Sequence, residues 1–150
     1  KGVVKSIAYD PVSKKKSDVA MKEFDLPKDY YKILLPKEGV NKLIDGNVYS
    51  TMFVNVNDMI KIEYNEEQNI SGFRYMPSQS RDASRHIIDF EFYIDGKLVK
   101  SGAFGNIKNN PIEQVVSFES IKGKTICFVP KSNTDKASNC GIAEFSVITE

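Results

Sequence analysis

The acidic side chains of this chain include two close pairs, and paired carboxylates often carry hydrolytic chemistry. Asp89 and Glu91 fall on one face of an alternating apolar and polar run, and Glu66 and Glu67 adjoin in a polar stretch. A hydrolytic pair faces across a cleft at about 5–9.5 Å, with one pKa raised. Neighbours on one strand face instead point together into solvent. With a lone histidine, His86, and no serine or cysteine nucleophile placed beside a base, the sequence argues against an enzyme.

Metal and redox chemistry have few candidate residues. The chain has two cysteines and one histidine, which are too few for a four-ligand zinc site unless carboxylates join them. Cys127 lies in a strand-like run, where a buried small apolar side chain is the simpler interpretation. A disulfide with Cys140 stays open, because the sequence does not set the register. A phosphate-binding loop is disfavoured, since Gly102-Ala103-Phe104-Gly105 lacks both the spacing and the following helix.

The charge balance argues against polyanionic partners. Lys and Arg together number 21 and Asp and Glu 20, for a formal net charge of +1. Proteins that hold nucleic acid or an anionic membrane usually carry a basic excess, so neither is expected as a partner. No apolar run approaches the roughly 18 residues of a membrane span, and no signal peptide is visible. Since the first residue is Lys1 rather than Met, we expect a mature or excised fragment.

Alternating apolar and polar residues predict strands along most of the chain. The run from Ile60 to Tyr64 alternates as a half-buried strand does, and a polar turn is expected over 65–69 before a strand that ends at Pro77. The strongest alternation covers 88–94, and Asp95-Gly96 after it predicts a hairpin with a type I′ turn. Further strands are expected within 3–9, 19–24, 30–34, 112–118, 126–128 and 143–147.

These strands predict an all-β fold, an antiparallel β-sandwich or jelly roll. Roughly eight short strands separated by turns are typical of that class. The one helical candidate, 39–44, is too short for much more than a single turn. The pattern over residues 1–25 predicts one hairpin, which is too small to form a stable domain of its own. We therefore expect 1–25 to be the C-terminal hairpin of a preceding β-domain plus a linker, and 26–150 to be the sandwich.

Several short runs, taken in order, resemble one known family. These runs are Asp45-Gly46-Asn47, Ile60 to Asn65, Ile70-Ser71-Gly72-Phe73-Arg74-Tyr75-Met76-Pro77, Gly102-Ala103-Phe104 with 109–111 and 114–118, and Ala143-Glu144-Phe145. Over about 30–147 the chain resembles discoidin, or coagulation-factor type C, domains. That group includes the family-32 carbohydrate-binding modules and has a galactose-binding-domain-like fold. The first 25 residues are similar to the end of a small β-domain of bacterial β-hexosaminidases (chitobiases) and fucosidases.

The resemblance implies a structural calcium ion held by the Asp-Gly turn. Carried over to this sequence, Asp45 would supply a carboxylate, Asn47 a carbonyl, and Ser50 a hydroxyl and a carbonyl in place of the family's threonine. Glu144 would close the site from the last strand. Calcium takes about six to eight hard oxygen ligands, and turns readily present backbone carbonyls. The alternative is that Asp45-Gly46-Asn47 is a favourable turn that needs no metal.

The resemblance also implies a sugar site at one end of the sandwich, with an aromatic ring for the C–H face of the sugar and planar polar groups for its hydroxyls. The chain has no Trp, and Met52 stands where the family has one, so the aromatic candidates near loops are Tyr49, Phe53 and Phe104. The polar candidates lie in two long loops, 78–86 and 132–139, which we expect to meet. They are Gln79, Arg81, Arg85, His86 and Asn133. The alternative is a solvated loop whose cations pair with Asp82 and Asp89.

The function that the resemblance implies is non-catalytic carbohydrate binding. The module would hold an attached secreted or periplasmic bacterial glycoside hydrolase near glycans with terminal galactose- or N-acetylhexosamine-type sugars, binding weakly so that avidity matters. A second hypothesis is a structural spacer that packs on the catalytic domain of its own chain and binds no sugar. A third, lipid binding, would need apolar loop tips, for which Met52-Phe53 is the one candidate, and the near-neutral charge argues against it. We expect a monomer, secreted, periplasmic or at the cell surface.

Overall fold

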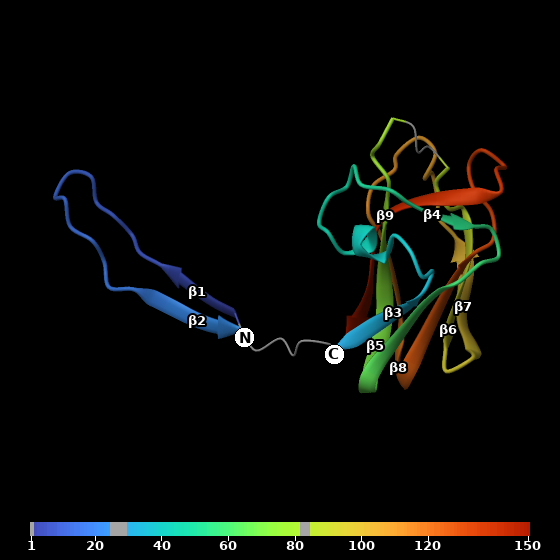
Figure 1. The fold of residues 1–150 in the computed structure, drawn as a ribbon, viewed down its shortest axis with the longest axis horizontal. Helices are drawn as coiled ribbons and strands as arrows, with labels where there is room; N and C mark the ends of the chain where they lie inside the picture. Colours follow the sequence, from blue (N-terminus) through green and yellow to red (C-terminus); the bar gives the residue numbers. More distant parts are fainter. Residues whose placement is uncertain (1, 25–29, 82–84) are drawn as a thin grey trace. The chain divides into compact units, whose positions relative to one another are not determined.

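The chain divides into two compact units. A computed structural model describes residues 2–24, 30–81 and 85–150, and its contacts group into one unit over Lys1–Tyr30 and a second over Tyr31–Glu150 (Figure 1). The sequence placed a boundary after residue 25, and residues 25–29 lie outside the described part. Whether the first unit belongs to a preceding β-domain stays a prediction.

The first unit is an antiparallel hairpin of β1 (Gly2–Ser6) and β2 (Ala20–Phe24). Side chains hold the connection between its strands. The Asp10 carboxylate accepts the backbone N–H of Val12 at 2.9 Å, and the Ser17 hydroxyl accepts the N–H of Ala8 at 2.9 Å. A two-stranded hairpin is marginally stable at best on its own.

The second unit is a β-sandwich, which confirms the predicted fold class. Its strands are β3 (Tyr31–Leu35), β4 (Met52–Asn55), β5 (Ile60–Pro77), β6 (Asp89–Ile94), β7 (Lys97–Ala103), β8 (Gln114–Pro130) and β9 (Asn139–Thr149). Every pairing between them in the described residues is antiparallel, in the order β4-β9-β5-β8-β6-β7, with β3 added beside β5. The one helical element described is a 3₁₀ turn, η1 (Val40–Leu43), inside the segment that the sequence marked as at most one turn.

The two long strands, β5 and β8, belong to both layers of the sandwich. The N-terminal half of β5 pairs with β3 and its C-terminal half with β9, while β8 runs beside both halves. The C-terminal half of β8 also pairs with β6. One layer is therefore β3-β5-β8-β6-β7, the five-stranded layer, and the other is β8-β5-β9-β4. Their facing side chains form the core, as in other sandwiches.

The polar turn expected over 65–69 is wrong, because β5 continues through it. Glu63 lies opposite Thr125 and Gln68 opposite Gly123, so five steps along β5 face two steps along β8. The additional residues of β5, at 65–67, are exposed. The polar run therefore marks a bulge-like irregularity, and such irregularities bend a strand. Likewise 112–118 and 126–128, expected as separate strands, fall largely within the single strand β8.

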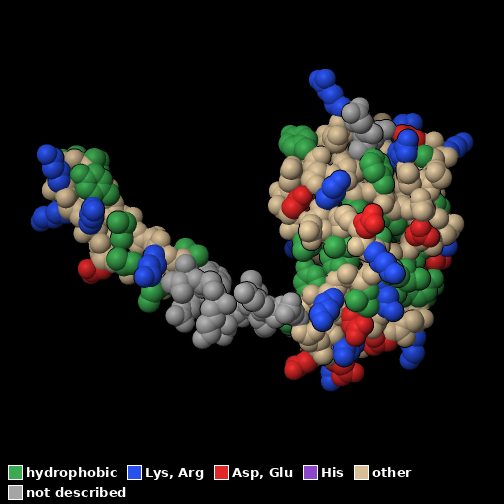
Figure 2. Space-filling view, viewed as in Figure 1, with side chains coloured by type: hydrophobic (Ala, Val, Ile, Leu, Met, Phe, Trp, Pro, Cys, Tyr) green, Lys and Arg blue, Asp and Glu red, His purple; other side chains and the backbone are tan. Residues whose placement is uncertain are grey.

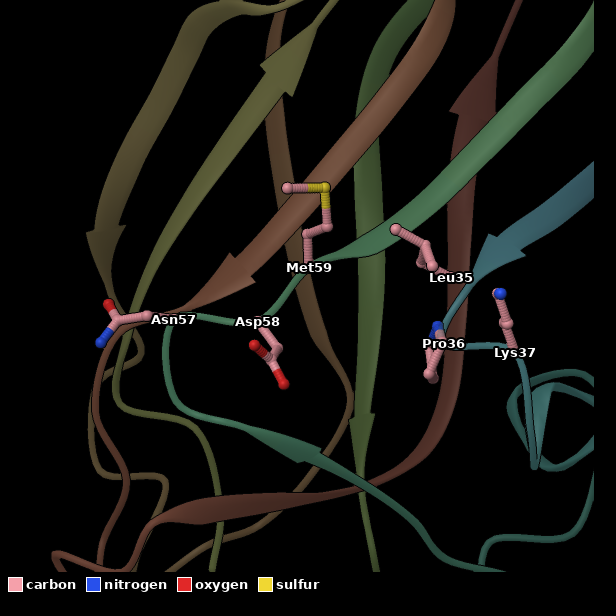
Figure 3. A pocket seen from close by; sticks show the side chains of 6 residues that line it. All are labelled: Leu35, Pro36, Lys37, Asn57, Asp58 and Met59. Atoms are coloured by element: carbon pink, nitrogen blue, oxygen red, sulfur yellow. The ribbon is translucent and has the colours of Figure 1, made fainter.

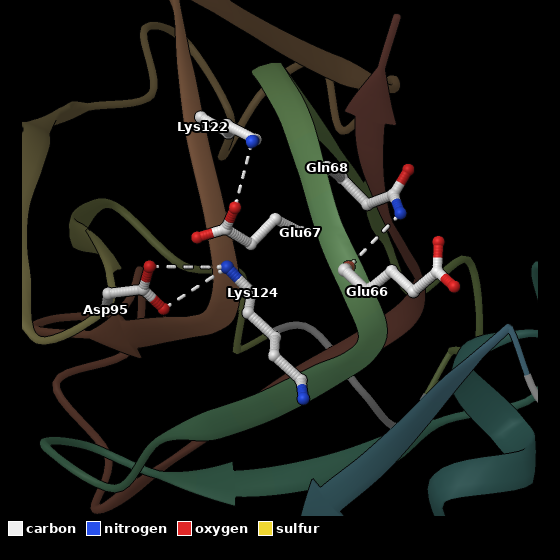
Figure 4. Close-up of polar contacts among 6 residues, drawn as sticks. All are labelled: Glu66, Glu67, Gln68, Asp95, Lys122 and Lys124. Carbon is white, nitrogen blue, oxygen red and sulfur yellow. Dashed lines mark hydrogen bonds and ion pairs between the residues drawn. The ribbon is translucent and has the colours of Figure 1, made fainter.

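The predicted hairpin at Asp95-Gly96 is confirmed, with positive φ of 48° and 78° at its two central residues. This turn is also fastened to β8. The Asp95 carboxylate accepts the backbone N–H of Thr125 at 2.8 Å. It also accepts the backbone N–H of Lys124 at 3.2 Å, the contact drawn in Figure 4. Nearby, Lys122 and Glu67 form an exposed ion pair at 2.9 Å, a contact of small energetic weight. Asp95 therefore satisfies backbone donors where the pairing of β5 and β8 is irregular.

The core is a cluster of phenylalanine rings centred on Phe73 of β5, which is fully buried. Its ring centroid lies 4.8 Å from that of Phe92, 5.3 Å from those of Phe90 and Phe128, and 5.7 Å from that of Phe145. Offset and edge-on aromatic pairs at such distances stabilise a fold beyond the burial of their area. Because Phe90 and Phe92 come from the five-stranded layer, the cluster joins the two layers.

The surface of the second unit carries charges of both signs. Figure 2 shows Lys and Arg side chains lying among Asp and Glu side chains on the visible face of the sandwich. Cys127 and Cys140 are both free, and their strands, β8 and β9, do not pair with each other, so the disulfide that the sequence left open is not formed. No helix in the described ranges is long and apolar enough to cross a membrane.

Candidate functional site

The two long loops that carry most of the predicted polar residues meet at one end of the sandwich, which confirms that geometric expectation. Ile87 forms an isolated antiparallel bridge with Asn133. Ile88 donates its backbone N–H to the Ser132 carbonyl at 3.0 Å, and Thr134 donates its N–H to the His86 carbonyl at 2.9 Å. The described parts of the β5–β6 and β8–β9 loops thus run side by side.

Two further loops join them. The Gln79 backbone N–H donates to the Val48 carbonyl at 2.9 Å, and the Thr51 and Ser78 hydroxyls lie 2.5 Å apart, which attaches the segment before β4. The Gln79 side-chain amide donates to the Pro111 carbonyl at 2.7 Å, which attaches the β7–β8 loop. We call this set the loop end, defined by the described residues of 45–51, 78–88, 104–113 and 131–138.

Asn133, predicted as a sugar ligand, is engaged in shaping its own loop. It is 4% exposed, and its side-chain NH₂ donates to the carbonyls of Ala137 at 2.8 Å and Asn139 at 3.1 Å. Its side-chain oxygen accepts the backbone N–H groups of Ala137 and Asp135, at 3.0 and 3.1 Å. With both ends of the amide engaged, Asn133 supports the loop rather than presenting free groups to a ligand.

His86 and Gln79 are also turned inward. His86 is 7% exposed, and its Nε2 lies 3.1 Å from the Ser78 carbonyl oxygen. Its Nδ1 is buried and has no hydrogen-bond partner. The Gln79 NH₂ group donates to the carbonyls of both Pro77 and Pro111. Among the six predicted sugar ligands, Tyr49 is 70% exposed and Arg81 is exposed, whereas Arg85 and Gln79 are half-buried.

Arg85 brings together a cluster that the sequence did not assemble. Its guanidinium carbon lies 6.0 Å from the centre of the Phe53 ring, and its Nη1 donates to the Asn139 side-chain oxygen at 2.6 Å. Phe53 is 48% exposed on β4. The ring of Phe53 and the planar polar groups of Arg85 and Asn139 are the kinds of group that the sugar prediction calls for. We call these three residues the Phe53 cluster.

The sequence named Phe53 among the aromatic candidates near loops, and the structure shows why its ring is accessible. Met52 and Val54 are buried, so the side chain between them on the strand faces outward. Asn139 lay inside the predicted 132–139 loop but was not singled out. Its bond with Arg85 joins residues 54 positions apart, which no local pattern reveals.

The predicted calcium residues lie close together at the turn after η1. The Asp45 carboxylate accepts the Asn47 backbone N–H at 2.8 Å, and Gly46 supplies the positive φ of 72°. That backbone bond, followed by a bond from the Ser50 hydroxyl, holds the pKa of Asp45 below its usual range. Glu144 of β9 reaches the same turn. Its pKa is raised, first by burial and then by the neighbouring Asp45 carboxyl.

The donor set at this turn suits a hard cation. Glu144 Oε1 is buried without a hydrogen-bond partner, beside the carboxyl of Asp45. The described residues hold no cluster of three or more His, Cys, Asp or Glu side chains, so a cation here would also need the oxygens of Asn47 and Ser50. Calcium accepts such mixed carboxylate, hydroxyl and carbonyl sets.

Solved structures with the same fold include family-32 carbohydrate-binding modules. The family-32 module of Clostridium perfringens NanJ, in complex with galactose, superposes with a TM-score of 0.61 at 17% identity over 78% of this chain and 89% of that one. CpGH89CBM32-5 from the same organism, in complex with GalNAc-β-1,3-galactose, gives 0.61 at 17% identity over 79% and 91%. The C-terminal domain of a Bacteroides fragilis chitobiase gives 0.59 at 19% identity over 83% and 97%.

The chain thus has the β-sandwich fold of family-32 carbohydrate-binding modules, which confirms the discoidin-like resemblance at the level of fold. At identities below 25% the likeness establishes the fold and no more. No protein-family model and no curated protein matches the sequence.

Proposed function

We propose that the second unit is a non-catalytic carbohydrate-binding module whose sugar site is the Phe53 cluster, which adjoins the loop end. The observation that carries the proposal is the meeting of an exposed aromatic ring, a guanidinium and an amide from three different segments. Sugar-binding neighbours of the same fold support it. The ligand class is a terminal galactose- or N-acetylhexosamine-type sugar.

Each residue of the cluster has a role that follows from its chemistry. The exposed part of the Phe53 ring offers an apolar face to the C–H groups of a pyranose. Arg85 has five N–H donors, and one is given to Asn139, so others can bond sugar hydroxyls. The Asn139 NH₂ adds donors beside them. Asn133 and His86 position the loops, and Tyr49 and Arg81 remain candidates for the rim of the site.

The proposal includes a structural calcium ion at the turn after η1. Asp45 and Glu144 would supply carboxylates, and Asn47 and Ser50 the further oxygens. The buried, unpartnered Glu144 Oε1 supports it, because leaving a buried carboxylate oxygen unpaired is costly. Calcium added to metal-free protein should raise the melting temperature, and Glu144→Gln should abolish most of that rise. A rise that is equal in Glu144→Gln would place any bound calcium elsewhere.

Catalysis is not part of the proposal. The carboxylates that the sequence paired have structural partners, since Glu91 accepts the Tyr93 hydroxyl at 2.8 Å and Asp89 accepts the Ser132 hydroxyl. The module would instead keep an attached, secreted glycoside hydrolase near its substrate, acting as a monomer outside the cell. The alternative is a spacer that packs on that catalytic domain and binds no sugar.

An NMR titration of labelled protein tests the proposal. Galactose, N-acetylgalactosamine, N-acetylglucosamine and fucose are added separately, with and without calcium. We expect shifts of the backbone amides at 53, 85 and 139, and a loss of affinity of about tenfold or more in Phe53→Ala and Arg85→Ala. Val115→Ala, at a 50% exposed position on β8 outside the Phe53 cluster, is the matched control. If folded, calcium-loaded protein shows no shifts at tens of millimolar sugar, the spacer becomes the leading function.

A further inference from the structure

Two depressions lie on the outer face of the five-stranded layer, and one of them reaches the loop end at Lys131. One depression of about 430 Å³ lies between the end of β3 and the β4–β5 turn, lined by Leu35, Pro36 and Asp58 among others (Figure 3). A second, of about 330 Å³, continues across β8 and β6. Both are lined by Asn57 and Met59, so the two depressions adjoin at these residues, and we treat them together. We call the pair the outer-face groove.

The floor of the groove is apolar because of the strand alternation. On β6 and β8 the residues that alternate with the buried phenylalanines face outward, and the register places Tyr93 opposite Cys127 and Glu91 opposite Val129. Met59, 40% exposed, joins them from the β4–β5 turn. Open apolar surface of this kind, accompanied by a few placed polar groups, is typical of ligand sites.

The polar groups along the groove balance in charge. Two carboxylates, Asp58 and Glu91, line it together with two ammonium groups, Lys37 and Lys131. Glu91 accepts the Tyr93 hydroxyl at 2.8 Å and pairs with Lys131 at 3.3 Å, which fixes these side chains beside the apolar floor. A surface with mixed, balanced charge favours a neutral ligand that is rich in hydroxyl groups over an anionic or cationic one.

We propose that the outer-face groove binds the interior of a neutral polysaccharide chain. A pyranose ring has apolar C–H faces and a polar edge of hydroxyls, which match the floor and the rims of the groove. The two adjoining depressions suit successive units of a chain rather than a single terminal sugar. An extended peptide is the poorer fit, because it would need backbone donors and acceptors of a strand edge, whereas this floor is made of side chains and Pro36 lacks an N–H.

The proposal is independent of the Phe53 cluster, and the two can fail separately. The test is affinity electrophoresis in native gels that contain soluble galactan, galactomannan, hydroxyethylcellulose or glycol chitin. We expect at least one polysaccharide to retard the protein. Tyr93→Ala and Met59→Ala, in different segments of the groove, should each lower the affinity for that polysaccharide, calculated from the retardation, by about tenfold. Arg85→Ala and the control Val115→Ala should keep it.

Two results would overturn the proposal that the outer-face groove binds a polysaccharide chain. One is no retardation by any of the four polysaccharides. The other is retardation that Arg85→Ala abolishes or that both groove variants retain, since the loop end or another surface would then carry it. Circular dichroism of each variant separates lost binding from lost folding, and the NMR titration with monosaccharides reports on the Phe53 cluster independently.

Discussion

Gly72 is a position at which the sandwich should tolerate an added methyl group poorly, because the two nearest atoms are backbone atoms. It lies in β5 between β8 and β9, opposite Ser117 on one side and Ile148 on the other. A Cβ built there would lie 2.3 Å from the Val116 carbonyl oxygen, 3.2 Å from the Ser117 Cα and 3.3 Å from the Ile148 Cδ1. The first of these contacts is with backbone, which cannot rotate out of the way.

The cost of Gly72→Ala follows from that contact. Carbon–oxygen contacts between strands are normally about 3.3–3.6 Å, so β5 and β8 would have to separate by roughly 1 Å. Overpacking of this kind costs about 1–3 kcal/mol, and each weakened ladder hydrogen bond adds about 1 kcal/mol. We expect a loss of about 3–5 kcal/mol, a large part of the stability of an ordinary domain, and a fall in melting temperature of roughly 10–20 °C.

Urea and thermal unfolding, followed by far-ultraviolet circular dichroism, measure this loss. Gly105→Ala is the matched control, because a Cβ at Gly105 meets nothing within 4 Å, and its melting temperature should change little. A loss below about 1 kcal/mol in Gly72→Ala, or an equal loss in both variants, would refute the close approach of β5 and β8 from which the argument starts.

Three further predictions concern polar groups. Asn133→Ala removes four hydrogen bonds from the β8–β9 loop, so it should cost about 2–3 kcal/mol in urea unfolding and weaken sugar binding without a direct contact; unchanged stability would contradict the loop's dependence on this amide. Asp95→Ala leaves two backbone N–H groups of β8 without their acceptor and should cost about 1–3 kcal/mol, with Asp95→Asn intermediate. In metal-free protein the raised pKa of Glu144 contributes stability that is present below pH 4.5 and is lost as the pH rises through the folded-state pKa of Glu144. The lowered pKa of Asp45 acts in the opposite direction, and its contribution is lost as the pH falls through the folded-state pKa of Asp45. Melting curves across pH 3–8 should therefore lose the Glu144 part of this dependence in Glu144→Gln, and a pH profile identical to the wild type would refute the assignment.

The parts of the fold that local rules control could be predicted from the sequence. The Asp95-Gly96 hairpin is an example, because few pairs of adjacent residues readily adopt positive φ at both positions. The alternation in β6 correctly placed Phe90, Phe92 and Ile94 inside. The polar run at 65–69 misled, since an exposed bulge and a turn select the same polar residues, and only the pairing partner distinguishes them.

The candidate site could be predicted in outline but not in detail. The meeting of the two long loops follows from the sandwich, and the structure confirms it. What local patterns do not show is the direction of each polar side chain. Asn133 and His86 read as exposed loop residues, yet their loops bury them, while Phe53 and Asn139 meet Arg85 through contacts distant in sequence.

The pairing of β5 also separates the two ends of the second unit from the loop end along the length of the strand. Tyr31, where the second unit begins, lies opposite Tyr64, and Thr149, near its end, lies opposite Ile70, so both lie against the middle of β5. The loop end begins where β5 stops, at Pro77. That point lies about 23 Å along the strand from Ile70, at about 3.3 Å per residue, and farther from Tyr64. A covalent tether leaving either end of this unit therefore departs well behind the loops. The proposed sugar site is thus separated along the strand from both points at which other chain would join this unit.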